Sequence, residues 1–81
     1  MTIKLSRHAQ RRLKLYKIDS ADVETVINNW LKSRSILNDR ETIIARELKQ
    51  KYGYPLKIIF VVEGSEIVLV TAYPLKKEKK Q

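Results

Sequence analysis

The chain has 81 residues, enough for one small domain, and its 17 Lys and Arg side chains outweigh 9 Asp and Glu to give a formal charge of +8. It lacks cysteine and has one histidine, which excludes disulfides and thiolate metal sites, so we expect no metal and no cofactor. It has no apolar run near the ~18 residues of a membrane span, and we expect no signal peptide. The sequence therefore predicts a cytoplasmic protein with a polyanionic partner and no membrane association.

The N-terminal segment predicts a short strand at "TIKL" followed by a helix over residues 7–17. Ser6 is a suitable helix cap, and Ala9, Leu13 and Tyr16 share one apolar stripe. The first 17 residues contain no acid, and their basic side chains are Lys4, Arg7, Arg11, Arg12, Lys14 and Lys17.

A second helix is predicted over about residues 20–32, with Asp19 as its cap. Its apolar residues repeat at the spacing of a helix that faces a core: Val23, Val26, Ile27, Trp30 and Leu31. We interpret Trp30 as a core residue rather than a base-stacking platform because it lies on this stripe.

The second half changes to the pattern of strands. "SRSIL" predicts a weak strand, "NDRE" a turn and "TIIAREL" a further strand, although a helix over "RETIIARELKQK" is a competing interpretation. "KYGYP" then breaks the chain. Two β-branched runs, 56–63 and 66–73, flank Gly64-Ser65 and predict a hairpin.

Counting back from this turn sets a register in which Phe60 faces Leu69, Ile58 faces Thr71 and Leu56 faces Tyr73. That register directs Thr71 and Tyr73 toward the helices. The opposite face is smaller but still apolar, so it is a candidate homodimer surface.

Together these elements predict an α+β fold, a two-layer sandwich of strand, helix and helix followed by an antiparallel β-meander. We expect one domain over residues 1–75 and a disordered basic tail over residues 76–81.

Two motifs carry a family resemblance, "SRHAQRR" at the first helix and "VTAYP" in the last strand, with "KIDSADVETVIN" between them. Over residues 5 to about 74 the chain resembles the family catalogued as domain of unknown function 4258. It also resembles the RelE/ParE-type toxin fold of the barnase–EndoU–colicin–RelE group. One departure is that family members often have arginine-glycine before the second helix, where this chain has Tyr16-Lys17.

The resemblance implies a small endoribonuclease of the toxin type, a RelE-like mRNA interferase or a relative, with RNA as substrate and an antitoxin protein as partner. Metal-independent RNA cleavage needs a proton acceptor, a proton donor and fixed cations around the phosphate. The candidate catalytic residues are His8, Arg12, Thr71 and Tyr73. The candidate nucleic-acid-binding residues are Arg7, Arg11, Lys14 and Arg46, the last expected on the strand before the hairpin.

Two other classes of function remain open from the sequence. One is a basic module that binds nucleic acid through phosphate contacts without catalysis. The other is an interaction protein that dimerises through its second sheet face. The surroundings of His8 distinguish the ribonuclease from the binding module. A ribonuclease is favoured if His8 meets a second polar group in the fold, and the binding module is favoured if it does not.

Overall fold

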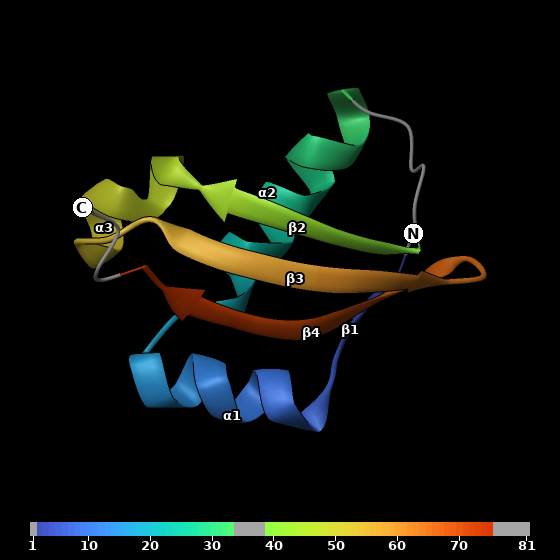
Figure 1. The fold of residues 1–81 in the computed structure, drawn as a ribbon, viewed down its shortest axis with the longest axis horizontal. Coiled ribbons are helices and arrows are strands. Elements are labelled where there is room, and N and C mark those ends of the chain that lie inside the picture. Colours follow the sequence, from blue (N-terminus) through green and yellow to red (C-terminus); the bar gives the residue numbers. More distant parts are fainter. Residues whose placement is uncertain (1, 34–38, 76–81) are drawn as a thin grey trace.

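The computed structural model describes residues 2–33 and 39–75, which form a mixed α+β domain around one four-stranded sheet (Figure 1). Its elements in chain order are β1 (Thr2–Leu5), α1 (Arg7–Tyr16), α2 (Ser20–Ser33), β2 (Arg40–Ala45), the 3-10 helix η1 (Arg46–Leu48), α3 (Lys49–Tyr52), β3 (Leu56–Glu63) and β4 (Glu66–Pro74). The strand order is β1-β4-β3-β2, with β1 parallel to β4 and the other neighbours antiparallel. None of the described helices is both long and apolar enough to span a bilayer.

α2 covers one face of the sheet, behind β2 and β3 in Figure 1. The backbone N–H of Ala21 donates to Asp19 Oδ1 (2.9 Å), which confirms the predicted cap. Val23, Val26 and Ile27 are buried, and the Trp30 ring meets Phe60 edge to face at 5.6 Å between centroids. Trp30 is therefore a packing residue, as its spacing predicts.

α1 continues from β1 and lies beside β4 in Figure 1. The Ser6 backbone N–H donates to the Leu69 carbonyl (3.1 Å), and the Ser6 hydroxyl donates to the Val70 carbonyl (3.0 Å). The same hydroxyl accepts from the Ala9 N–H (3.0 Å), so the predicted cap is confirmed. Ser6 thus begins α1 and attaches it to β4.

α1 ends at Tyr16, one residue before its predicted end. Lys17 has a φ of 56° and a ψ of 44°, the left-handed conformation. The Lys17 and Ile18 N–H groups donate back to the carbonyls of Lys14 (3.3 Å) and Leu13 (2.8 Å). This pattern is a Schellman motif, which satisfies carbonyls that a helix end leaves without partners.

The segment "RETIIARELKQK", for which strand and helix are competing predictions, is a strand in its first part and helical in its second. A strand continues to Ala45, and the chain then turns into η1 and α3. Arg46 therefore opens η1, and its predicted place on the strand is wrong. Apart from Ser33, which ends α2, the predicted strand "SRSIL" lies outside the described residues, as do Asn38 and the predicted tail.

The hairpin forms at the predicted turn, where Gly64 adopts a φ of 63°. The predicted register holds from the turn to the Phe60–Leu69 pair. Val70 then has no partner across the strand, and this β-bulge shifts the remaining register by one residue.

Beyond the bulge, Ile59 pairs with Thr71 and Lys57 with Tyr73. Residues directly opposite in a ladder share a face, so Thr71 and Tyr73 lie on the side of the sheet away from α2. Their predicted position on the helix-bearing face is wrong, because one unpaired residue reverses every side chain after it. This second face, which we call the open face, turns toward the viewer in Figure 1, and no described helix crosses it.

Candidate nucleic-acid interface

Three polar side chains form a line along α1. Arg12 Nε donates to His8 Nε2 (3.4 Å), and Arg12 Nη1 donates to the Tyr16 hydroxyl (3.5 Å). The three residues follow one another at intervals of four, the spacing that stacks side chains on one side of a helix. His8 is exposed, whereas Arg12 and Tyr16 are half-buried. Arg12 thus contacts both of its neighbours on this line, at distances that are long for hydrogen bonds.

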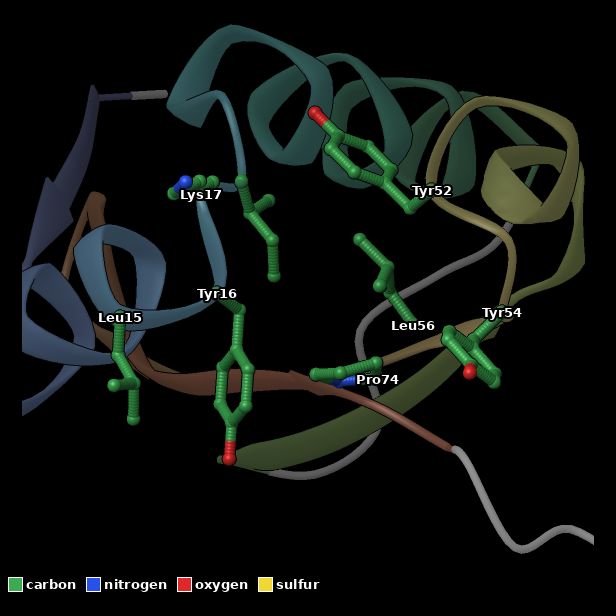
Figure 2. Close-up of a pocket in the computed structure, with 8 residues that line it drawn as sticks. Leu15, Tyr16, Lys17, Tyr52, Tyr54, Leu56 and Pro74 are labelled. Carbon is green, nitrogen blue, oxygen red and sulfur yellow. The ribbon is translucent and has the colours of Figure 1, made fainter.

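Figure 2 shows the Tyr16 side chain pointing away from α2. Arg12 contacts the hydroxyl at the end of that side chain. The bulge turns Thr71 and Tyr73 away from α2 as well, through β4. The predicted catalytic residues therefore come from two elements, His8 and Arg12 from α1 and Thr71 and Tyr73 from β4.

Within the described residues, the hydrogen-bond partner of His8 is Arg12, and neither Thr71 nor Tyr73 bonds to the imidazole. Thr71 is buried and Tyr73 is half-buried opposite Lys57. The structure thus supplies His8 with a second polar group, but that group is a cation on the same helix.

The other predicted binding residues separate into two places. Arg7, Arg11 and Lys14 are exposed on α1. Arg46 follows β2, and β3 and β4 lie between that strand and α1. The structure therefore gathers three of the four predicted cations at one edge and leaves Arg46 at the other.

A polar cluster that the sequence does not predict joins α2 to α3. Asp22 Oδ2 accepts from Lys51 Nζ (2.6 Å) and from the Tyr52 hydroxyl (2.5 Å), and that hydroxyl accepts from the Asp19 N–H (3.0 Å). The hydrogen bond from Lys51, followed by that from Tyr52, lowers the pKa of Asp22. The hydrogen bond to Asp22 raises the pKa of Lys51. Burial, followed by the hydrogen bond to Asp22, raises the pKa of Tyr52. Partners some 30 residues apart leave no local sequence signal.

A pocket of about 250 Å³ opens between the end of α1 and the segment before β3 (Figure 2). Its lining is rich in tyrosine and consists of Leu15, Tyr16, Lys17, Ile18, Tyr52, Tyr54, Leu56 and Pro74. Tyr16 belongs both to this pocket and to the line that begins at His8. The sequence favours a turn over a stacking pair at Tyr52 and Tyr54, and in the structure Tyr52 ends α3. In residues 2–33 and 39–75, no three His, Asp or Glu side chains gather as metal ligands.

The comparisons with known proteins give a family. The family model described as "Domain of unknown function (DUF4258)" matches residues 5–74. The chain belongs to the DUF4258 family. No curated protein and no solved structure matches it. The DUF4258 match runs from the end of β1 to the end of β4, so it contains the His8–Arg12–Tyr16 line, the bulge and every residue that lines the pocket.

Proposed function

We propose that this DUF4258 domain binds RNA, with its phosphates held along α1. The observation that carries the proposal is the state of Arg12. Its guanidinium contacts His8 (3.4 Å) and Tyr16 (3.5 Å), neither of which is a carboxylate. A planar guanidinium donates to phosphate oxygens in pairs, and such charge-assisted hydrogen bonds are stronger than these two long contacts.

The charge around Arg12 supports the same function. α1 contains no acidic residue, and Arg7, Arg11 and Lys14 are exposed on it. The ion pairs found among the described residues, Lys4–Glu66 and Lys51–Asp22, do not involve α1. The positive charge of this helix is thus left for an external anion, and binding of a polyanion there releases counterions.

The test is the salt dependence of RNA affinity, compared between two doubly substituted proteins. Arg11→Ala with Arg12→Ala removes two charges from α1, and Lys32→Ala with Lys49→Ala removes two exposed charges from α2 and α3. The slope of log K against log salt falls by about 0.7 for each lost phosphate contact on single strands. We expect the first protein to flatten the slope by about 1.4 and the second to leave it nearly unchanged. Absence of binding by the natural chain at low salt, or equal effects of the two pairs, would contradict the proposal.

A second candidate function, metal-independent RNA cleavage by a toxin-like ribonuclease, is favoured by the order of groups on the same line. His8 Nε2 accepts a hydrogen bond, Arg12 is a cation beside it and Tyr16 carries a hydroxyl. Attack by a 2′-hydroxyl on the phosphate needs a general base, a cation that stabilises the charged phosphate and a general acid. His8, Arg12 and Tyr16 would take these roles in that order. The RelE-like fold, an antitoxin partner and roles for Thr71 and Tyr73 belong to this second proposal.

A further inference from the structure

The tyrosine-lined pocket has the size and lining for one aromatic ring system. Its volume of about 250 Å³ is below the ~300–1,000 Å³ of pockets that hold drug-sized ligands. Tyr16, Tyr52 and Tyr54 contribute rings, and Leu56 and Pro74 contribute apolar surface. Such a lining favours a flat, uncharged group over an ion.

The hydroxyls of two of these tyrosines already make hydrogen bonds within the protein. These residues therefore offer their rings, rather than their hydroxyls, to a ligand in the pocket. The Tyr52 hydroxyl donates to Asp22 and accepts from the Asp19 N–H. The Tyr16 hydroxyl accepts from Arg12. Figure 2 shows these two hydroxyls pointing in opposite directions, away from Leu56 between them. The pocket is thus suited to stacking, which accepts any base, rather than to hydrogen-bonded selection of one base.

Two positively charged side chains lie at the rim of the same pocket. Arg12 contacts the outer end of Tyr16, and Lys17 is exposed and belongs to the lining. A ring inside the pocket would therefore have cations beside it, where a nucleotide carries its phosphate. Aromatic platforms next to a basic track are the combination that binds single-stranded nucleic acid.

We infer that this pocket stacks one unpaired nucleobase of the RNA whose phosphates α1 holds. The inference rests on the proposed function and adds its substrate class, single-stranded rather than duplex RNA. A paired base is stacked between its neighbours and cannot enter, whereas an unpaired base can be turned into the pocket.

Tyr54 is the residue with which to test the pocket. It is 39% exposed, and substitution there leaves the Asp22–Tyr52 contact and the Arg12–Tyr16 contact in place. Tyr54→Leu removes the ring but keeps apolar bulk, and Tyr54→Phe is the matched control that keeps the ring. Thermal unfolding of each variant checks that the fold is retained.

The measurement is the affinity of each protein for a short single-stranded oligoribonucleotide and for an abasic oligomer of equal length and charge. Loss of one stacked base lowers affinity by about 5- to 150-fold. We expect the natural chain and Tyr54→Phe to prefer the base-bearing oligomer by such a factor, and Tyr54→Leu to lose most of the preference. The salt slope should stay the same in all three, because no phosphate contact changes.

The other outcomes overturn the inference in distinguishable ways. Equal affinity of the natural chain for both oligomers would leave phosphate binding intact and remove the base pocket. A preference that survives in Tyr54→Leu would place base recognition elsewhere. Failure to bind either oligomer at low salt would remove the proposed function and the pocket with it.

Discussion

Arg12 and His8 meet one turn apart on α1, with Arg12 Nε donating to His8 Nε2 over 3.4 Å. This distance is at the long end for a hydrogen bond, so the contact is easily exchanged for a stronger one. On the proposed function, a phosphate that binds the guanidinium would release His8 Nε2, because Arg12 donates more strongly to an oxyanion than to an imidazole nitrogen. Phosphate binding at Arg12 and the availability of His8 Nε2 would then be coupled.

The first prediction concerns cleavage by this pair. If the domain cleaves RNA, His8→Ala should lower the rate with EDTA present by about 10²- to 10⁴-fold, the usual contribution of a positioned general base. RNA affinity should change much less, because the charge proposed to bind phosphate comes from Arg12 and the other basic side chains of α1. The measurement is cleavage of a mixed RNA together with affinity at the same salt. Arg12→Ala is the comparison, since it should weaken both. Equal cleavage rates for the natural chain and His8→Ala would remove His8 from the chemistry.

The second prediction concerns acid stability and the Asp22 cluster. Because the folded-state pKa of Asp22 lies below its usual 3.8, the contact stabilises the fold above that pH, and the stabilisation disappears as pH falls through the folded pKa. Asp22→Asn should therefore be less stable than the natural chain at pH 7, and the difference should shrink toward zero at the acid end. Denaturant unfolding across this range measures it. Glu24→Gln, on the same helix but outside the cluster, should show a much smaller pH-dependent difference. A constant gap for Asp22→Asn at every pH would contradict the assignment.

The third prediction concerns Ser6, whose hydroxyl accepts from Ala9 and donates to Val70. Ser6→Ala removes the helix cap and an attachment of α1 to the bulge, so unfolding free energy should fall by about 1–2 kcal/mol. Chemical denaturation provides the value. Ser6→Thr keeps a hydroxyl at the same place and should recover most of the loss. A Ser6→Ala protein as stable as the natural chain would show that water replaces both contacts without loss.

Local patterns in the sequence are enough for much of this fold. The stripe that includes Val23 and Ile27 predicts α2, and the glycine at position 64 predicts the hairpin turn, because each depends on neighbouring residues. The contact of His8 with Arg12 also follows from helical spacing. The catalytic and binding roles assigned to these residues stay predictions.

Features that depend on distant partners are not predictable in this way. The strand "VLVTAY" is apolar except for its threonine, and nothing in its letters marks Val70 as the unpaired residue. Counting from the turn therefore assigns Thr71 and Tyr73 to the wrong face. The pocket needs the end of α1, the chain after α3 and the end of β4 at one place, which only the tertiary fold provides.

The last prediction concerns the backbone conformation of Lys17, the residue that follows the first helix. Lys17 adopts the left-handed conformation, which a side chain with a Cβ enters at a cost of about 1 kcal/mol and glycine enters freely. Lys17→Gly should therefore raise the unfolding free energy by about 0.5–1 kcal/mol, somewhat less than that cost because glycine also loosens the unfolded chain.

Denaturant unfolding of Lys17→Gly, beside Lys17→Ala, separates backbone strain from the loss of the lysine side chain. Both variants remove the same positive charge at the pocket rim, so RNA affinity should fall equally in the two. Stability should rise in Lys17→Gly alone, because alanine keeps the Cβ that the left-handed conformation disfavours. A gain of the same size in both would trace the effect to relief of charge repulsion near α1 rather than to the backbone.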